Sequence, residues 1–486
     1  MSSPLSRSNQ KAQHNNGDNG FQFPKWEVLI ETGLLKRILL TIALLAFYRF
    51  GVQIPLSGID HAAFMAKGSG FLNSNVLGLV DLFAGGALSS LSIFALGIGP
   101  YITSSIMMQL LSEVFPQLKT LQQERGESGR REYQQWIRRL SVFIAIIQSF
   151  ALTKWLVSSG LVTDLPIMFF LKSVISLTTG CVFVMWIGEL ISEFGIGNGA
   201  SLLIFAGIAA RLPKMIAQTS EAVKTGITPT WGIITLLAFF LLSILAIIYV
   251  QDGIRKLLIV NAKNVTGQVR GPANSNFLPF KINPSGVMPI IFASALLYVP
   301  LQILSFFTGR PDLGMSASLQ KIFVEGKFFK PLVKPLLDIN WLKNFFTWCG
   351  AFFDRLFDYY SFEHSLLYFS LIVIFAFFYS SIQLNPREIA ENLQKGGSAV
   401  QGVKPGKATA EYINKVLSRI IFIGATCIAL ITILPIHVEK FCQVTTLGSI
   451  GGTSLIIMVG VALDLNNQMI AYLQSHQYKV RSLLGS

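Results

Sequence analysis

The sequence predicts an all-α polytopic membrane protein, because of its composition and the way its apolar residues are grouped. Of its 486 residues, 52% are apolar and only 13% are charged. Blocks without Asp, Glu, Lys or Arg occupy 82–112, 225–251, 282–309, 364–386, 420–438 and 441–463. Each block is long enough to cross the hydrocarbon core of a bilayer, which takes roughly 20 helical residues. The composition excludes a disordered chain, a coiled coil and an ordinary globular enzyme.

Ten membrane-spanning helices follow when the apolar runs are bounded by charged and turn residues. In chain order they are centred near Leu45, Ile102, Ile147, Val174, Ala206, Leu241, Ala293, Ile374, Ala425 and Gly460. An even number of spans places both termini on one side, and the connecting segments of that side carry most of the Lys and Arg residues. The positive-inside rule makes this side cytoplasmic. The excess of 39 Lys and Arg over 25 Asp and Glu is therefore attributed to topology rather than to nucleic-acid binding.

The predicted organisation divides the chain into two halves of five helices with polar ends. The parts are a polar N-terminal segment at 1–33, a first half at 34–220, a second half at 221–472 and a C-terminal tail at 473–486. Two cytoplasmic loops, at 251–283 and 383–415, and an extended outer loop at 308–361 belong to the second half.

The second, seventh and tenth spans are diluted with Gly, Ser, Thr and Pro. Small residues at membrane depth are typical of close helix packing, and they also suit helices that surround a shared cavity. Pro100 and Pro289 each fall in the second span of their half. Matched interruptions of this kind indicate an internal duplication with a site between the two halves.

Residues that could catalyse a reaction or bind a solute are scarce in the spans. Arg49, Lys154, Lys172, Glu189 and Asp464 lie near the expected span ends, and the five histidines fall in tails or loops. The sequence contains no HExxH, GxSxG or Gly-rich phosphate loop, so we expect neither an enzyme nor a cofactor. A secondary solute transporter with inverted repeats would need polar ligands at mid-membrane. A lipid scramblase or other membrane enzyme would need a catalytic pair in or beside the bilayer. The spans contain neither feature, so both alternatives are less favoured.

Isoleucine recurs at helical spacing in the second and fifth spans and is also present in the seventh and tenth. The residues are Ile98, Ile102, Ile106, Ile204, Ile208, Ile291 and Ile457. They either pack the protein core or converge on an apolar constriction, which would exclude ions because an ion cannot shed its hydration shell against methyl groups. Such a constriction suits a large, chemically varied cargo.

Seven longer motifs follow one another along the chain. They are FAGGALSSLSIFALGIGPYITSSIMMQLL (83–111), ERGESGRREY (124–133), GIGNGASLLIFAGI (195–208), FKINPSGVMPIIFAS (280–294), NPREIAENLQKGG (385–397), GKATAEYINKVLSRI (406–420) and GGTSLIIMVGVALD (451–464). In content and order these motifs resemble the landmarks of the SecY family, the central pore-forming subunits of the Sec protein translocase. The resemblance extends over nearly the whole chain.

The resemblance implies two pseudo-symmetric, inverted halves of five helices that close like a clamshell around an hourglass pore. It also implies a protein-conducting channel, which passes unfolded secretory polypeptides across the membrane. Apolar segments would leave sideways into lipid through a lateral gate, between the second and third helices on one side and the seventh and eighth on the other. The implied pore ring consists of Ile98, Ile102, Ile204, Ile208, Ile291 and Ile457. The implied plug lies near 79–90 and includes Leu79, Val80, Asp81, Leu82, Phe83, Ala84, Gly85 and Gly86.

Two loops of the family dock a motor or the ribosome, and basic residues of this chain match them. Arg255 and Lys256 match the loop between the sixth and seventh helices. In the loop between the eighth and ninth, Lys404 stands before Pro405 and Gly406, where the family usually has arginine. Lysine keeps the charge but lacks the planar donor geometry of arginine, so we expect a weaker or reshaped contact.

The resemblance also implies partners and a location. The partners are SecE-like and SecG-like small membrane subunits, a SecA-type motor ATPase, the ribosome, polypeptides that bear signal sequences, and the lipid bilayer. The location is the plasma (inner) membrane of a bacterium, with both termini cytoplasmic, and the plastid thylakoid membrane is the alternative.

The outer loop at 308–361 is longer than the family pattern leads us to expect. Within it Trp341, Phe345, Trp348 and Phe352 share one helical face. This pattern predicts an amphipathic helix at the outer membrane surface, and a soluble folded insertion is the alternative.

Overall fold

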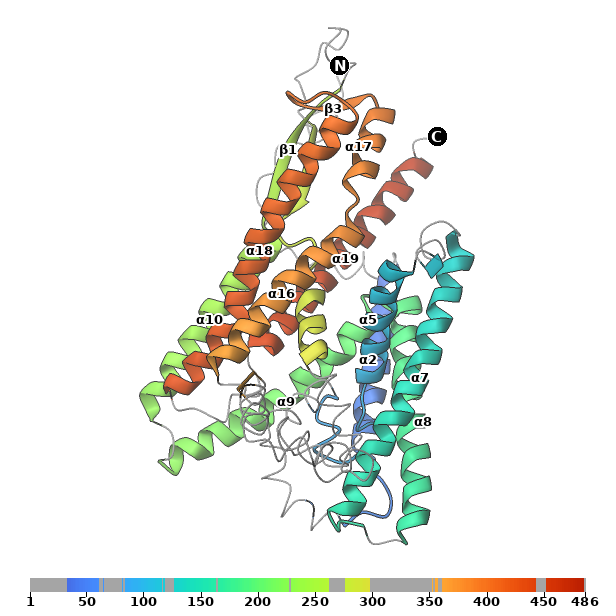
Figure 1. Ribbon diagram of the computed structural model, residues 1–486, viewed down its shortest axis with the longest axis vertical. Helices are drawn as coiled ribbons and strands as arrows, with labels where there is room; N and C mark the ends of the chain where they lie inside the picture. Colours follow the sequence, from blue (N-terminus) through green and yellow to red (C-terminus); the bar gives the residue numbers. More distant parts are fainter. Residues whose placement is uncertain are drawn as a thin grey trace, which may run out of the picture.

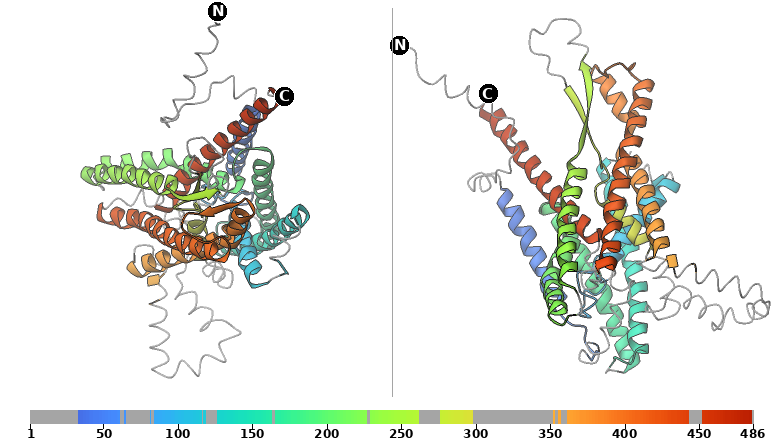
Figure 2. Two further views of the ribbon diagram at one scale, coloured as in Figure 1. Left: turned by 90° about the horizontal axis from the view of Figure 1, so that it is seen from above. Right: turned by 90° about the vertical axis from the view of Figure 1, so that its left-hand side faces the viewer.

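Long helices make up most of the described chain in the computed structural model, and a small sheet stands at one end (Figures 1 and 2). The structure describes residues 33–60, 64, 81, 84–115, 117–118, 126–162, 165–226, 229–261, 276–297, 352, 355–356, 361–442 and 452–484. The N-terminal segment up to residue 32 and almost all of the outer loop at 308–361 lie outside these residues. The interfacial helix predicted for that loop is therefore untested.

The described residues of the first half of the chain form five long helices. They are α2 (Leu34–Val52), α5 (Gly99–Val114), α7 (Gly126–Ser158), α8 (Pro166–Phe194) and α9 (Gly199–Lys224). α7 packs against both α5 and α8, and α8 in turn packs against α2 and α9. In Figure 1 the α5, α7 and α8 helices stand together, and α9 runs diagonally toward the other half.

The helices of the second half are arranged around α18. They are α10 (Thr230–Asp252), a short helix (Met288–Leu297), α16 (Phe362–Gln383), α17 (Pro386–Lys395), α18 (Lys407–Cys442) and α19 (Gly452–Leu484). α18 packs against α10, α16, α17 and α19, and α19 also packs against α9, which links the two halves. α19 continues to Leu484, so most of the predicted C-terminal tail is helical.

Each of the ten predicted span centres lies in a helix of this structure. Seven of the described helices, α7, α8, α9, α10, α16, α18 and α19, are long and apolar enough to cross a membrane. α2 has basic residues at both ends, α5 has 16 residues, and the helix Met288–Leu297 is shorter still. These three helices therefore have the weakest span signal. Two of them, α5 and the short helix, correspond to predicted spans that are diluted with small residues.

Pro100 and Pro289 begin helices rather than interrupt them. Each is the second residue of its helix, α5 and the short helix Met288–Leu297. Proline fits the first turn because its missing N–H would have no partner there. The second predicted span is thus helical only from Gly99, and residues 84–98 form turns. Gly97 has a φ of 54°, a left-handed conformation that ends regular structure before α5.

The start of α9 is set by an asparagine and a glycine. The side-chain oxygen of Asn198 accepts hydrogen bonds from the backbone N–H groups of Ala200 (3.1 Å) and Ser201 (3.4 Å). This cap satisfies N–H groups that have no partner within the helix. Gly199 lies directly against the backbone carbonyl of Gly188, with no room for a Cβ atom. The chain can therefore turn sharply between α8 and α9, with the backbone at the start of α9 in contact with α8.

A three-stranded antiparallel sheet adds a β element to the predicted all-α architecture. β1 (Ile254–Asn261) lies between β2 (Asn276–Lys281) and β3 (Ser398–Val400). β1 pairs with β2 from Ile254 opposite Lys281 onward, and with β3 from Ile259 opposite Val400. The sheet therefore joins the two predicted cytoplasmic loops, 251–283 and 383–415, into one structure.

The prediction that all histidines fall in tails or loops is wrong for two described residues. His364 lies in the first turn of α16 and His437 lies inside α18. The hydroxyl of Ser365 is 3.0 Å from His437 Nε2, and the backbone carbonyl of Leu356 is 2.8 Å from His364 Nδ1. The imidazole rings can be accommodated at these positions because each has a hydrogen-bonding partner within reach.

The first testable prediction concerns Gly452, at the start of α19. A Cβ atom there would collide with the backbone carbonyl of Thr432 in α18, whereas a Cβ atom on Gly99 would meet nothing within 4 Å. We expect Gly452→Ala to lower the free energy of unfolding by about 1–3 kcal/mol, and Gly99→Ala to change it little. Thermal unfolding of both variants in the same detergent measures this. Equal stabilities would contradict the close contact between α18 and α19.

Candidate functional site

The six isoleucines of the implied ring come from four separate segments of the chain. Ile98 directly precedes α5 and Ile102 lies in it, Ile204 and Ile208 lie in α9, Ile291 lies in the short helix and Ile457 lies in α19. Ile102 is half-buried, and the other five are at most 3% exposed. All six belong to one hydrophobic cluster or pack against it. The fold therefore gathers side chains that are far apart in the sequence.

The surroundings of these isoleucines are apolar and partly aromatic. Phe292, next to Ile291, packs edge-to-face on Phe375 and Tyr379 of α16, with ring centroids 6.1 and 5.9 Å apart. Within the described ranges, no group of three His, Cys, Asp or Glu side chains could hold a metal ion. The cluster presents methyl groups and ring edges, which form no strong bond to an ion or a polar solute.

The implied plug is in part described, and the described part is held by α2. Asp81, Ala84, Gly85 and Gly86 are described, whereas Leu79, Val80, Leu82 and Phe83 lie outside the described residues. The hydroxyl of Tyr48 donates to the carbonyl of Ala84 (3.2 Å), and Arg49 Nη1 donates to the carbonyl of Gly85 (2.8 Å). Through these two side chains, the last turn of α2 holds the segment Ala84–Ser90. We call this segment, together with Asp81, the plug segment.

The plug segment also lies directly on α9. A Cβ atom on Gly85 would lie 2.9 Å from Gly207 Cα, and one on Gly207 would lie 2.6 Å from Gly85 Cα. Gly85 has a φ of 66°, in the left-handed region that favours glycine. Gly207 directly precedes Ile208. The contact with the plug segment therefore lies beside the ring residues of α9.

An ion pair joins the same two elements. Asp81 Oδ2 lies 3.1 Å from Arg211 Nη2, and the Asp81 side chain is 1% exposed. Asp81 Oδ1 accepts a hydrogen bond from the backbone N–H of Ser89 (2.8 Å). Asp81 lies outside the described helices that are long and apolar enough to cross a membrane. Burial raises the pKa of the Asp81 carboxyl, and the positive charge of Arg211 opposes that rise.

Arg211, Tyr48 and the pairing with Asp81 were not indicated by the sequence. A partial signal existed, because Arg211 is a charged residue three positions after Ile208 in an apolar span. Its partner is far earlier in the chain, and nothing local connects the two. Arg49 was expected near a span end, where the structure has it in the last turn of α2.

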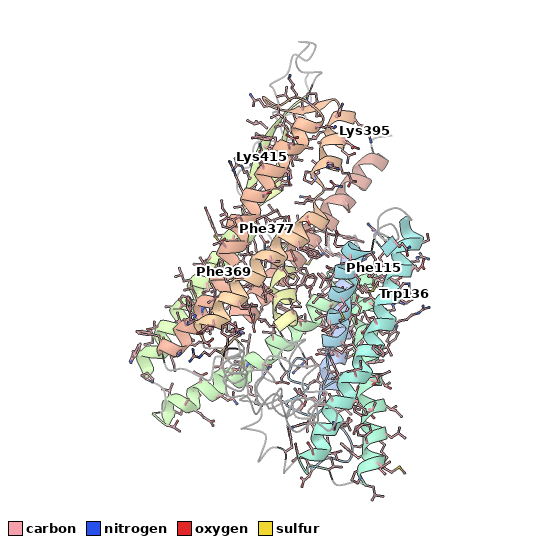
Figure 3. The ribbon with its side chains drawn as sticks, viewed as in Figure 1. Phe115, Trp136, Phe369, Phe377, Lys395 and Lys415 are labelled. Carbon is pink, nitrogen blue, oxygen red and sulfur yellow. The ribbon has the colours of Figure 1, made fainter. Side chains whose placement is uncertain are left out.

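The three basic residues matched to docking loops are exposed at the sheet. Arg255 and Lys256 lie on β1, and Lys404 lies in the turns after β3. Lys256 Nζ is 5.8 Å from the centre of the Phe277 ring on β2, a cation–π contact. The backbone N–H of Gln401 donates to the carbonyl of Leu258 (3.2 Å), which ties the second loop to β1. The side chains of Lys395 and Lys415 lie at this same end of the molecule (Figure 3).

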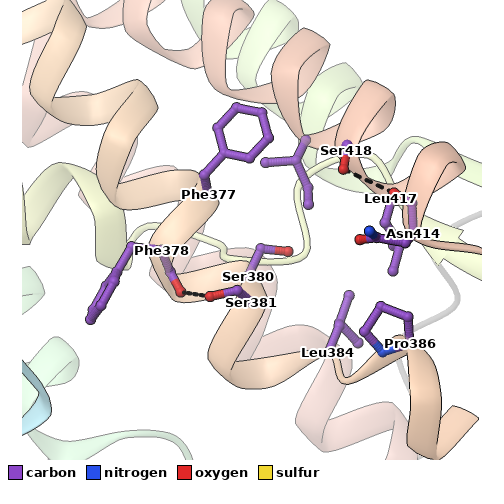
Figure 4. Close-up of a pocket in the computed structure, with 10 residues that line it drawn as sticks. Phe377, Phe378, Ser380, Ser381, Leu384, Pro386, Asn414, Leu417 and Ser418 are labelled. Atoms are coloured by element: carbon purple, nitrogen blue, oxygen red, sulfur yellow. Dashed lines mark hydrogen bonds between the residues drawn. The ribbon is translucent and has the colours of Figure 1, made fainter. Parts of the chain in front are cut away.

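A cleft of about 410 Å³ opens between the adjoining ends of α16 and α18 (Figure 4). Its lining includes Phe377, Ser380, Asn414 and Leu417. The hydroxyl of Ser380 is buried there without a hydrogen-bond partner. No ring, plug or docking residue lines the cleft, so it is separate from the candidate site.

Comparison with known proteins identifies the family. A family model described as SecY matches residues 92–466. The protein translocase subunit SecY of Synechococcus elongatus is 40% identical over 450 residues, which cover 92% of this chain and 94% of that protein.

Solved structures share the fold. One described as "The structure of a protein conducting channel" is 16% identical and covers 90% of this chain and 92% of that one, with a TM-score of 0.59. Sec61 in the canine ribosome-channel complex from the endoplasmic reticulum is also 16% identical, with the same coverage and a TM-score of 0.56. The ten-helix clamshell expected from the motifs is confirmed, and the chain belongs to the SecY family.

Proposed function

We propose that this chain forms the pore of a translocase that passes unfolded secretory polypeptides across a membrane. The observation that carries the proposal is the gathering of the six ring isoleucines in one apolar cluster, beside a plug segment held by α2 and α9. An unfolded polypeptide cannot enter lipid, because each unpaired backbone group costs several kcal/mol in hydrocarbon. It needs a path through protein, and that path must stay closed to ions.

A ring of branched aliphatic side chains meets both requirements. At rest, packed methyl groups exclude ions and water. During passage, the same side chains yield around a polypeptide of any sequence because they form no polar bond with it. A solute transporter would instead hold its substrate with polar ligands, and the six isoleucines offer none. The chain thus acts as a channel and not as an enzyme.

Apolar segments of the cargo would leave sideways, through a lateral gate between α5 and α7 on one side and the short helix and α16 on the other. Transfer into lipid is favourable by about 0.8 kcal/mol for each buried CH₂ group. The aromatic contact of Phe292 with Phe375 and Tyr379 joins the short helix to α16, the two helices of the second side. This aromatic packing holds the two helices of the second side together, so that they can move as one side of the gate.

The docking surface would be the sheet end of the molecule, with Arg255, Lys256 and Lys404 as its charged contacts. Since the sequence lacks a phosphate-binding loop, the driving energy must come from a partner, either a SecA-type motor ATPase or the ribosome. SecE-like and SecG-like small membrane subunits would complete the channel. The sheet end and both termini would then be cytoplasmic, and 308–361 would lie outside.

The membrane would be the plasma membrane of a bacterium, with the plastid thylakoid membrane as the alternative. The two halves, 34–220 and 221–472, would be the two shells that part when cargo passes. The packing of the described helices supports this division, because α7 and α8 pack within the first half and α18 packs within the second, while α9 and α19 join the two.

The second testable prediction concerns the ring. Replacing Ile208 by Ser removes branched methyl groups and adds a hydroxyl that can hold water, so we expect Ile208→Ser to raise the ion conductance of the resting channel and to relax the rejection of defective signal sequences. Single-channel recording in planar bilayers and export of a reporter with a weakened signal measure the two effects. Ile234→Ser in α10, at a side chain that is 67% exposed, is the matched control. Equal conductance for both variants would count against the ring assignment.

The third testable prediction concerns docking. Reversing two exposed charges by Arg255→Glu with Lys256→Glu should weaken binding of the partner from the cytoplasmic side, and the loss should shrink at high salt because salt screens surface charges. Lys404→Arg should preserve or strengthen binding, since arginine adds planar paired donors. Binding of a purified SecA-type ATPase to channels in proteoliposomes measures both. Arg130→Glu, at an exposed position of α7, is the control, and an equal loss with this control would argue against a specific surface at β1.

A further inference from the structure

We propose that the ion pair between Asp81 and Arg211 is a lock that holds the plug segment closed and couples its release to widening of the isoleucine ring. The lock sets how readily a polypeptide opens the resting channel. This inference rests on the proposed function and assigns specific residues to its control.

Asp81 makes contacts both within the plug segment and with α9. Its Oδ1 accepts from the backbone N–H of Ser89 (2.8 Å), and its backbone carbonyl accepts from the N–H of Gly86 (2.9 Å). Both bonds fold the segment back on itself. Its Oδ2 faces Arg211 Nη2 at 3.1 Å. One carboxylate thus shapes the plug segment and also attaches it to α9.

The contacts from α2 and from α9 differ in kind. Tyr48 and Arg49 of α2 bond to backbone carbonyls of Ala84 and Gly85, and such bonds depend little on which residues the segment contains. Arg211 of α9 contacts a side-chain carboxylate, so its hold requires an acid at position 81. Among the described residues, this is the one ion pair between the plug segment and a helix.

The pair lies on the helix that carries part of the ring. Arg211 follows Ile208 by three residues, a spacing that places both near one another on the helix surface. Gly207, between Ile204 and Ile208, touches Gly85. A shift of α9 that moves Ile204 and Ile208 outward must therefore also strain the contacts that hold the plug segment. Plug release and ring widening become one event through α9.

The energetics favour a lock that is sensitive to the loss of either partner. Asp81 is fully buried and Arg211 is largely buried, with its Nη1 lacking a hydrogen-bond partner. Removing one partner of a buried pair leaves an uncompensated charge, which is strongly destabilising, whereas replacing both partners removes that cost. The closed state should therefore suffer more from either single replacement than from the double replacement.

The experiment is a double-mutant cycle on the full channel complex in planar bilayers, with Asp81→Asn, Arg211→Met and both together. The asparagine side chain keeps an oxygen for the Ser89 N–H, so the cycle isolates the charge. We expect each single variant to raise the resting ion conductance by about tenfold or more, and the double variant to leak less than the product of the two effects. Lys214→Met, three residues further along α9 and exposed, should leave conductance unchanged.

A second measurement reports on the plug segment itself. Ala87 is fully buried in the closed state, so a cysteine introduced by Ala87→Cys should react slowly with a membrane-impermeant maleimide added from the outer side. Arg211→Met should speed this labelling, measured against the same chain without the added cysteine. Faster labelling without a change in conductance would mean that the plug segment moves independently of the ring and would overturn the coupling.

The outcomes separate this lock from the proposed function. Single variants that neither leak nor label faster, in channels where Ile208→Ser leaks, would overturn the lock and leave the channel intact. Multiplicative effects in the double variant would also overturn it, because they would show two independent contacts. Channels that pass neither ions nor polypeptide under any condition would instead overturn the proposed function.

Discussion

The candidate site depends on the close approach of two glycines, Gly85 in the plug segment and Gly207 in α9. Side chains at these positions would force the two backbones apart. A Cβ atom on Gly85 would also lie 2.9 Å from the hydroxyl oxygen of Tyr48, so the missing side chain leaves room for the polar groups of Tyr48, Arg49 and Arg211 beside the plug segment. Gly85 also needs its left-handed φ, which other residues adopt at a cost. A missing side chain thus allows three polar contacts to form in an otherwise apolar environment.

The same reasoning explains why small residues gather at helix contacts while the ring is built of isoleucine. Gly180 lies against the backbone of Ile93, Gly199 against Gly188 and Gly424 against Ile282. In a membrane, helices gain little from burying apolar surface against one another, so close van der Waals packing becomes the main source of association. The proposed ring would have the opposite requirement, because its side chains would have to fill space when closed and yield when cargo passes. Large, branched, non-bonding side chains suit that role.

At the other end of the molecule, the sheet solves a different problem. If these loops dock a partner, as proposed above, their charges must be held in a fixed arrangement, or binding must first order them. Pairing of β1 with both β2 and β3 fixes Arg255 and Lys256 relative to the turns that carry Lys404. α17 and the start of α18 stand beside the sheet (Figure 1). The two loops therefore form one rigid platform.

The sequence by itself determined the spans, their order and the family, because hydropathy and motifs are read along neighbouring residues. All ten span centres fall in helices, and the isoleucines of α5 and α9 could be singled out from helical spacing within each segment. The first residue of α5 was harder to predict, because an apolar run does not reveal that residues 84–98 form turns.

Only the tertiary structure decided which distant residues meet. Asp81 with Arg211, Gly85 with Gly207, and β1 with β3 are pairs whose members look ordinary in their own segments, and His437 gained its partner from α16. The physical reason is that ion pairs, close backbone contacts and strand pairing depend on distance in space, and a pattern along the chain contains no information about that distance until the helices have packed.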